Sequence, residues 1–403
     1  MMARILTVTN LYPPHYLGGY ELLCRQVMQE LAARGHEIMV LTSTHGSGEA
    51  VETLDGMEVR RTLQLDTPFG SPPSVSRLRR MRAGHRNTQA FKDAAAAFRP
   101  ELVFIWSQLR LTIACTRAAE ALGMPTVCTM NDPHLGSFVA APFRPTPKGM
   151  VRWLTDRTIF RETTLLGLRL DRTTCISQML KDDLLALHVP MEQSMVIFQG
   201  IPLEQFPMKE RPGALGSPLR LLYAGQLHAY KGVHTLLEAA MLLQREQGLA
   251  LQVSIAGDGP AEYREQLQRQ AAEYDLNVSF LGRVLHSELP ALYRDSDLFV
   301  FTSTWREPFG LTHLEAMASG TPVVSTVDGG HGEFLVHMEN SLTFEKENAN
   351  ALADRILSLV QDAALRERLA AAGRREVEER FNMRRYVTDL ETLLLGLRTE
   401  GQP

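Results

Sequence analysis

The sequence predicts two doubly wound α/β domains, each built on a parallel sheet. Short runs of branched apolar residues alternate with amphipathic segments along the whole chain, and this alternation is typical of parallel sheets with crossover helices. The apolar runs are continuous, as in strands that are covered on both faces. At 403 residues the chain is also too long for one ordinary hydrophobic core.

The expected strands divide evenly between the two halves of the chain. The first half contributes RILTVTN (4–10), LVFIWS (102–107), TVCTM (126–130) and TTCIS (173–177). The second half contributes RLLYAG (220–225), QVSIAGDG (252–259), DLFVFTS (297–303) and TPVVST (321–326). Amphipathic segments at 20–35 and 233–248 each end in glycine, which indicates helices.

The predicted domain boundary lies where proline, glycine and charge interrupt this pattern. We expect a first domain at 1–205, a linker at 206–218 and a second domain at 219–375. Residues 376–403 are predicted to form a tail helix, because apolar residues recur there at helical spacing: Val377, Phe381, Tyr386, Leu390, Leu393 and Leu397. This helix needs a surface to cover, and we expect the first domain to provide it.

The composition is that of a soluble cytoplasmic protein, with 44% apolar and 22% charged residues and no 18-residue apolar run. The apolar N-terminal segment is too short for a signal peptide and is expected to be a buried strand. A net charge of −4 argues against a nucleic-acid partner. The four cysteines have neither zinc-site nor disulfide spacing and are expected in the core: Cys24, Cys115, Cys128 and Cys175.

Two segments of the first domain are locally basic. Residues 70–100 hold seven basic side chains and one acidic one, and residues 143–172 hold seven and three. The second segment also carries Trp153, Ile159 and Phe160. Contact with anionic lipid at the inner face of the membrane and an ordinary solvated helical face both fit this pattern.

Three junctions between a strand and a helix carry residues suited to binding an anion, because free N–H groups and the helix dipole attract negative charge there. At the first, Lys231 stands at the start of a predicted helix. A positive charge is unfavourable near this positive end of the helix dipole unless an anion binds there. At the second, Gly18 and Gly19 allow close approach of the backbone, although the G-x-G-x-x-G fingerprint is absent. A solvated lysine and a plain turn are the alternatives.

The third junction, REPFGLTHLE, combines an anion site with two carboxylates. Glu307 and Glu315 are separated by seven residues, and the amides of Gly310, Leu311 and Thr312 are predicted to be free at the helix start. Dipole compensation would account for one isolated glutamate. A ligand that combines a diphosphate with sugar hydroxyls would account for both glutamates. The diphosphate would bind the cation and the amides, and the hydroxyls would bind the carboxylates. This combination describes a nucleotide sugar.

The chain resembles the family-four retaining glycosyltransferases of GT-B architecture. The resemblance rests on Gly18-Gly19, on GQLHAYKG (225–232), IAGDGP (255–260) and DGGHGEFL (328–335), and above all on EPFGLTHLEAMASG (307–320). It covers essentially the whole chain. It implies two Rossmann-like domains that face each other across a donor cleft, with a UDP- or GDP-sugar as donor and no cofactor or metal ion.

Carried over by position, the resemblance also assigns roles. Glu307 would hold hydroxyls of the transferred sugar, Glu315 would accept from both ribose hydroxyls, and Lys231 would neutralise the diphosphate. Gly18 and Gly19 would approach the phosphates from the other domain. The remaining donor contacts would come from Gly257 and from the amides of Phe309, Gly310, Leu311 and Thr312.

The sequence departs from the family pattern at two places. Gln226 replaces the arginine of the usual Gly-Arg-Leu loop, so Arg283 or another basic residue substitutes for it, or donor affinity is reduced. Asn131 and Asp132 stand where the family has His-Asp, and His134 lies close enough to take the histidine's place or to be structural.

The implied reaction is metal-independent transfer of a sugar to an acceptor hydroxyl with retention, in glycan, glycolipid or glycoside biosynthesis. Fixed positive groups would then stabilise the leaving group. The candidate catalytic residues are Glu307, Lys231, His134, Asp132 and Asn131. Two alternatives stay open: a nucleotide-sugar epimerase of related fold, which would need an acid and a base at the sugar ring, and a non-catalytic protein that binds sugar nucleotides.

Overall fold

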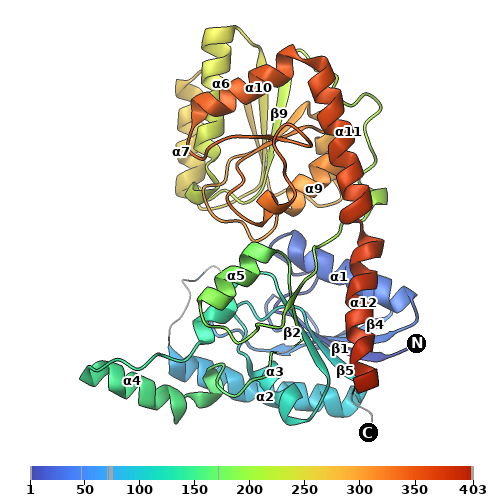
Figure 1. Cartoon of the computed structure of the whole chain (residues 1–403), viewed down its shortest axis with the longest axis vertical. Coiled ribbons are helices and arrows are strands. Elements are labelled where there is room, and N and C mark those ends of the chain that lie inside the picture. Colours follow the sequence, from blue (N-terminus) through green and yellow to red (C-terminus); the bar gives the residue numbers. More distant parts are fainter. Residues whose placement is uncertain (1, 47, 70, 72–75, 171, 401–403) are drawn as a thin grey trace. The chain divides into compact units, whose positions relative to one another are not determined.

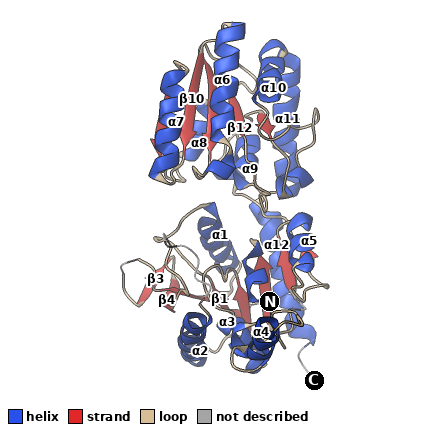
Figure 2. Ribbon diagram, turned by 90° about the vertical axis from the view of Figure 1, so that its left-hand side faces the viewer, coloured by secondary structure: helices blue, strands red, loops and turns tan. Residues whose placement is uncertain are grey.

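The structure is a computed structural model that describes residues 2–46, 48–69, 71, 76–170 and 172–400, without the side chains of 397–400. It divides the chain into two compact units. The first comprises Met1–Ile197 and Val387–Pro403, and the second comprises Phe198–Tyr386. Each unit is a sheet covered by helices (Figures 1 and 2), which confirms the predicted fold class.

The first unit contains an eight-stranded sheet in the order β3-β4-β2-β1-β5-β6-β7-β8. Neighbouring strands are parallel, except for the antiparallel pair of β3 and β4. The strands are β1 (Arg4–Val8), β2 (Glu37–Ser43), β3 (Val51–Leu54), β4 (Met57–Leu63), β5 (Leu102–Ile105), β6 (Thr126–Met130), β7 (Thr173–Cys175) and β8 (Met195–Val196). Strand β5 is buried along its whole length and β2 is buried except at Glu37, because helices cover both faces of the sheet.

The helices of the first unit are α1 (Gly19–Ala33), α2 (Arg77–Phe98), α3 (Ala114–Ala121), α4 (Pro147–Arg157) and α5 (Gln178–Ala186), with a 3-10 helix at Pro133–Phe138. Ser76 caps α2, since its side chain accepts the N–H of Arg79, and Thr146 caps α4 in the same way through Gly149. These caps fix where two of the helices begin.

The second unit contains a six-stranded, fully parallel sheet in the order β11-β10-β9-β12-β13-β14. Its strands are β9 (Leu219–Ala224), β10 (Leu251–Ala256), β11 (Val278–Gly282), β12 (Leu298–Phe301), β13 (Val323–Ser325) and β14 (Leu342–Thr343). Its helices are α6 (Val233–Gln247), α7 (Ala261–Glu273), α8 (Leu289–Asp295), α9 (Leu311–Ala318), α10 (Ala349–Gln361) and α11 (Ala363–Arg380). Helices α7 and α10 pack on α6, while α8 and α11 pack on α9.

Each predicted strand segment overlaps an observed strand, and the predicted helices at 20–35 and 233–248 correspond to α1 and α6. The prediction lacked several strands, among them β4 and β11. Strand β4 alternates buried and half-buried residues, and β11 is only partly covered. Neither strand therefore shows the continuous apolar run that predicts a strand covered on both faces. The four cysteines are buried free thiols, as predicted.

Each sheet reverses its strand order at a central strand. In the first unit β1 lies between β2 and β5, and in the second unit β9 lies between β10 and β12. Loops that leave the two strands at such a point diverge to opposite faces of the sheet and open a crevice at the carboxyl edge, where ligands bind in open α/β sheets. We therefore expect a ligand-binding site at the loops after β9 and β12.

The prediction of a single tail helix was wrong. Helix α11 ends at Arg380, and a separate helix, α12 (Met383–Glu400), follows it. Ile201 separates the two helices, because its N–H donates to the carbonyl of Phe381 and its carbonyl accepts from the N–H of Met383. From Val387 onward α12 belongs to the first unit, where Glu391 binds Arg34 at 2.7 Å. The side chain of Leu397 and residues 401–403 lie outside the described residues.

The expected linker, 206–218, lies within the second unit, and the chain crosses between the units at Ile197–Phe198. The carboxylate of Asp297 accepts the N–H of Gly216 at 3.0 Å and the N–H of Arg220 at 2.8 Å. Because Asp297 precedes β12, it fastens the end of the segment to the sheet. In the described part of the chain, no helix is long and apolar enough to cross a membrane.

Candidate active site

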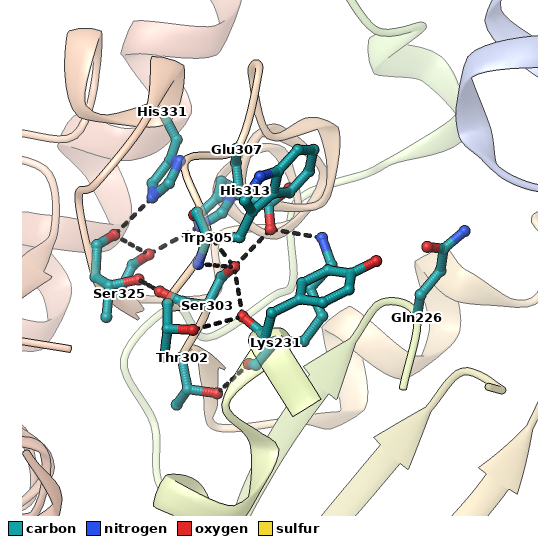
Figure 3. A network of polar contacts seen from close by, with 12 residues as sticks. Gln226, Lys231, Thr302, Ser303, Trp305, Glu307, His313, Ser325 and His331 are labelled. Atoms are coloured by element: carbon teal, nitrogen blue, oxygen red, sulfur yellow. Dashed lines mark hydrogen bonds and ion pairs between the residues drawn. The ribbon is translucent and has the colours of Figure 1, made fainter. Parts of the chain in front are cut away.

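The second unit brings Lys231 and Glu307 together, although 76 positions separate them in the chain. Lys231 Nζ donates to Glu307 Oε1 at 2.5 Å, and both residues are less than a tenth exposed. Lys231 follows β9 and Glu307 follows β12, so the pair lies where the strand order reverses (Figure 3). A buried ion pair at this position places a cation and a carboxylate at the expected ligand site.

A hydrogen-bonded chain of small residues holds the carboxylate. Ser303 Oγ donates to Glu307 Oε1 at 2.6 Å, and the carbonyl of Ser303 accepts the hydroxyl of Thr326 at 2.8 Å. His331 Nε2 lies 2.8 Å from the carbonyl of Thr326. Burial and the positive end of Lys231 lower the pKa of His331, although Glu307 opposes this, so the ring is neutral and donates from Nε2. Figure 3 shows this chain of contacts running from His331 to Glu307.

The backbone around the pair leaves little room for other residues. Gly232 has φ of +65°, and a Cβ on it would lie 2.2 Å from the carbonyl oxygen of Thr302. Thr302 in turn donates its hydroxyl to the carbonyl of Lys231 at 2.9 Å. On the other side, the N–H of Gly330 donates to the carbonyl of Glu307 at 2.7 Å. Both charged residues are therefore fixed through their backbones as well as by each other.

Aromatic rings surround the ammonium group of Lys231. Its Nζ lies 5.4 Å from the ring centre of Trp305, 5.6 Å from that of Tyr230 and 5.9 Å from that of Phe301. Such cation–π contacts stabilise a desolvated ammonium group. Trp305 and Tyr230 are each about two-fifths exposed, so the site has an aromatic rim.

Glu315 lies on α9, as the sequence predicted, and both of its carboxylate oxygens contact other side chains. Tyr293 donates its hydroxyl to Oε2 at 2.8 Å, and His286 Nε2 lies 3.3 Å from Oε1. Burial lowers the pKa of His286, but the hydrogen bond to Glu315 and the charge of that carboxylate raise it overall. The carboxylate is thus held in place by two residues that the sequence did not identify. Its role toward ribose remains a prediction.

The loops after β9, β10 and β11 carry three further predicted residues. The carbonyl of Gln226 accepts the hydroxyl of Tyr223 at 3.0 Å, while its exposed side chain stands apart from the network of Figure 3. Gly257 crosses the loop after β9 closely, since a Cβ on it would lie 1.8 Å from the carbonyl oxygen of Gly225. Arg283 follows β11 and is exposed. All three lie at the carboxyl edge of the sheet that also holds Lys231.

The start of α9 shows why the segment 309–312 is suited to a ligand. Among the described residues no side chain caps this helix, and Gly310 precedes it with φ of +131°. Leu311 and Thr312 form its first turn and are half-buried. Phe309 is buried and stacks on Phe198 at 6.0 Å, so its side chain anchors the loop. The amides of 310–312 belong to an uncapped helix start, as predicted.

In the first unit, Gly18 and Gly19 stand at the start of α1. The N–H of Gly18 donates to Glu21 Oε2 at 3.0 Å, which closes the first turn. The backbone of Gly18 is extended, with φ of −156°, and a Cβ on it would meet nothing within 4 Å. The local structure of this unit therefore does not demand glycine at position 18, and the role of Gly18 and Gly19 toward the phosphates remains a prediction.

The first unit also places Asn131, Asp132 and His134 directly after β6 (Thr126–Met130), beside a small pocket. Asn131 Nδ2 donates to the carbonyl of Trp106 at 3.1 Å, and Asp132 accepts the N–H of His134 at 2.7 Å. Burial raises the pKa of Asp132 to about 6. Burial, together with the charges of Arg80 and Arg110, lowers the pKa of His134 to about 4.

His134 is accordingly a neutral ring whose Nε2 accepts the N–H of Arg110 at 3.3 Å. This contact gives His134 a structural partner. Catalytic roles for His134, Asp132 and Asn131 remain predictions.

The sequence missed the residues that hold the two glutamates, namely Ser303, His286 and Tyr293. Ser303 lies in the predicted strand 297–303, and His331 lies in segment 328–335 of the family resemblance. A lone serine or histidine gives no indication of its partner in a single sequence. Tyr293 and His286 precede β12 and contact α9 only in the folded unit. No group of three or more potential ligands that could hold a metal ion occurs among the described residues.

Comparison with known proteins assigns both halves of the chain. The family model for glycosyl transferases group 1 matches residues 206–376, and the model for glycosyltransferase family 4 matches residues 17–205. A glycogen synthase of Mycobacterium tuberculosis is 30% identical to this chain over 421 aligned positions, which cover 99% of the chain and 96% of that protein.

Two solved structures show the same fold at lower identity. A sucrose-phosphate synthase from Thermosynechococcus elongatus has a TM-score of 0.74 at 23% identity and covers 99% of this chain and 100% of its own. The Anabaena protein HepE, in complex with UDP-glucose, has a TM-score of 0.72 at 19% identity, with 98% and 100% covered. The family models, the full-length relative and the shared fold lead to one conclusion: this chain belongs to the family 4, group 1 glycosyltransferases and has their GT-B fold.

Proposed function

We propose that this glycosyltransferase transfers a sugar from a UDP- or GDP-sugar to an acceptor hydroxyl, with retention of configuration and without a metal ion. The observation that carries the proposal is the buried pair of Lys231 and Glu307 at the carboxyl edge of β9 and β12. The group proposed to stabilise a departing diphosphate and the group proposed to hold sugar hydroxyls are in contact there.

The pair offers binding groups to both parts of such a donor. Lys231 has three N–H donors, and one is used by Glu307. Lys231 and Ser303 both contact Oε1 of Glu307, so Oε2 is the oxygen proposed to accept a sugar hydroxyl. The diphosphate would bind Lys231 and the uncapped start of α9, where the helix dipole and free N–H groups favour an anion.

Charge development explains how this arrangement would accelerate transfer. The diphosphate gains negative charge as the glycosidic bond breaks, and a fixed cation stabilises that charge more in the transition state than in the bound donor. We infer that Lys231 supplies this stabilisation in place of a metal ion. Because Glu307 is engaged in binding hydroxyls, we favour attack by the acceptor from the face that the leaving group vacates, which retains the configuration.

The relatives support a nucleotide-sugar donor without naming the sugar or acceptor for this chain. A solved structure of HepE holds UDP-glucose, and the full-length relative is a glycogen synthase. The four buried free cysteines agree with a reducing compartment, and we propose a cytoplasmic location.

Incubation of the purified protein with UDP-, GDP- and ADP-sugars, with and without a chelator, tests the proposal. Transfer to a sugar acceptor, or slow hydrolysis, with an unchanged anomeric configuration by NMR and no effect of the chelator, is the expected result. An isomerised sugar nucleotide would instead identify an epimerase, and binding without turnover would identify a non-catalytic binding protein. Loss of turnover in the presence of the chelator would contradict the metal-independent part.

A further inference from the structure

Helix α4 (Pro147–Arg157) projects at the edge of the first unit (Figure 1). It exposes large apolar side chains together with basic ones. Five apolar residues on the helix and its flanks are between 50% and 65% exposed: Phe143, Met150, Val151, Leu154 and Ile159. Four basic residues beside them are also exposed: Arg144, Lys148, Arg152 and Arg161. These nine residues are termed the α4 surface.

The spacing of these residues sorts them into two stripes. Met150 and Leu154 are four positions apart and Val151 and Leu154 are three apart, so the three lie on one helix face. Lys148 and Arg152 are also four positions apart, but at about 3.6 residues per turn they lie on the other side of α4, where Arg152 lines a pocket with Arg77 and Asp156. An exposed apolar face with basic residues on the polar side is the pattern of a helix that lies in the plane of a membrane interface.

The charge of the α4 surface has one sign. Asp156 is the only acidic residue between Asp132 and Glu162, and it is 4% exposed. Its carboxylate binds Arg77 at 2.7 Å and accepts the N–H of Ala141 at 2.9 Å. The one negative charge of residues 133–161 therefore fastens α4 to the start of α2, and the exposed charged residues of that range are all basic; the next acid, Glu162, is exposed and pairs with Arg117 at 3.1 Å.

The first turns of α2 (Arg77–Phe98) add to the same character. Arg77 contacts both Asp156 and Thr155 of α4. Leu78 and Met81 are exposed there, and residues 76–92 contain six basic side chains and no acidic one. The basic and apolar character thus extends from α4 onto the helix that anchors it.

We propose that the α4 surface docks the protein on an anionic lipid bilayer. A solvated face would account for the basic side chains but not for five neighbouring apolar residues that are at least half exposed. A soluble polyanion would use the cations and leave the apolar face in water. An anionic bilayer satisfies both, because the apolar side chains enter the acyl boundary while the cations meet the lipid phosphates.

Sedimentation of the full chain with vesicles of phosphatidylglycerol and of phosphatidylcholine tests the proposal. We expect binding to phosphatidylglycerol and little binding to phosphatidylcholine. Lys148→Ala/Arg152→Ala should weaken the binding roughly thirtyfold, since each basic residue near an anionic surface contributes a factor of roughly five. Arg245→Ala/Arg269→Ala, which removes two exposed cations from the second unit, is the matched control and should bind like the wild type.

The apolar contribution is tested separately. Val151→Ser/Leu154→Ser should remove the part of the binding that survives raised salt, because insertion of apolar side chains is not screened. Leu281→Ser/Leu285→Ser changes two exposed leucines of the second unit and should leave vesicle binding unchanged. Thermal melts of all four variants check that each remains folded.

Three results would overturn the proposal. The first is no binding of the wild type to phosphatidylglycerol vesicles. The second is equal loss of binding in the α4 variants and their controls. The third is binding to a soluble polyanion such as heparin, with the same dependence on Lys148 and Arg152 but without vesicle binding, which would assign the surface to an anionic polymer. Donor hydrolysis is measured in parallel, and the proposal stands or falls independently of it.

Discussion

Lys231 Nζ lies 2.5 Å from Glu307 Oε1, in a site where each side chain is about a tenth exposed. The pair links the loop after β9 to the loop after β12, the two central strands of the second unit. Removal of one partner leaves the other charge buried and unpaired, so each residue has a structural role in addition to its proposed role in transfer.

The first prediction concerns the stability of this pair. Lys231→Met and Glu307→Met should each lower the free energy of unfolding by about 3–5 kcal/mol, because each leaves a buried charge without its partner. The double variant should be more stable than the sum of the single effects implies, by about 1–3 kcal/mol. Denaturant unfolding of the four proteins measures this coupling. Strictly additive losses would show that the two side chains do not interact in solution.

The second prediction concerns Ser303, which donates to Glu307 Oε1 at 2.6 Å. Ser303→Ala should lower kcat/KM for donor turnover roughly ten- to hundredfold, because a hydrogen bond to a charged group contributes about 1.5–3 kcal/mol. Ser296→Ala removes a buried hydroxyl that binds only the carbonyl of Leu292 and serves as the control. Equal kinetics of the two variants would mean that Ser303 does not position the carboxylate.

The third prediction concerns the nucleotide end of the site. Glu315→Gln should weaken binding of the free nucleoside diphosphate by about 1–3 kcal/mol, because a neutral amide replaces a charged acceptor. Tyr293→Phe should weaken it less, since the carboxylate stays but loses the hydroxyl that orients it. Calorimetry with UDP and GDP measures both. Unchanged affinity in Glu315→Gln would rule out the ribose assignment.

The fourth prediction compares two glycines of the same helix. Gly232 and Gly248 flank α6 with the same backbone angles, φ of +65° and ψ of +22°. Gly248→Ala has open space and should lower the free energy of unfolding by about 1 kcal/mol, from the left-handed backbone alone. Gly232→Ala also clashes with the carbonyl of Thr302 and should lower it by about 2–4 kcal/mol. Similar melting temperatures for the two variants would contradict the tight packing of Lys231's loop.

The fifth prediction concerns pH and the two titrating groups after β6. The pKa of His134 is lowered to about 4, from about 6.5 in an unfolded chain. The unfolded chain binds the proton of His134 more readily than the folded protein does. The contribution of His134 to the free energy of unfolding therefore decreases as the pH falls from about 6.5 to 4. His134→Gln should therefore gain stability relative to the wild type over that range, as measured by melting temperature at several pH values.

Asp132 acts in the opposite direction and provides the matched variant. Its pKa is raised to about 6, from about 3.9 in an unfolded chain. The folded protein binds the proton more readily, so Asp132 adds stability below about pH 4 and loses it as the pH rises through 6. Asp132→Asn should lose stability relative to the wild type as the pH falls from about 6 to 4. The same trend in both variants would contradict these two shifts.

The sequence by itself determined the fold class and most of the central strands, and it indicated Glu307, Glu315 and Lys231 as candidate donor-binding residues. These features are local: continuous apolar runs predict covered strands, glycines end helices, and the spacing of Glu307 and Glu315 is written in one short segment. The break between α11 and α12 was not predictable, because its cause is a backbone contact with Ile201, 180 positions away from Phe381 in the sequence.

Only the tertiary structure decided which residues hold the site together. Lys231 and Glu307 were predicted to meet different parts of a ligand, and the order of the strands brings them into contact with each other. Tyr293 contacts Glu315 because α8 packs on α9, and His286 contacts it from the loop before α8. Likewise, Asp156 of α4 is buried against Arg77 of α2, a contact that the basic composition of the two segments did not predict. Burial and partner choice depend on contacts between segments distant in the chain, and a single sequence carries no signal for them.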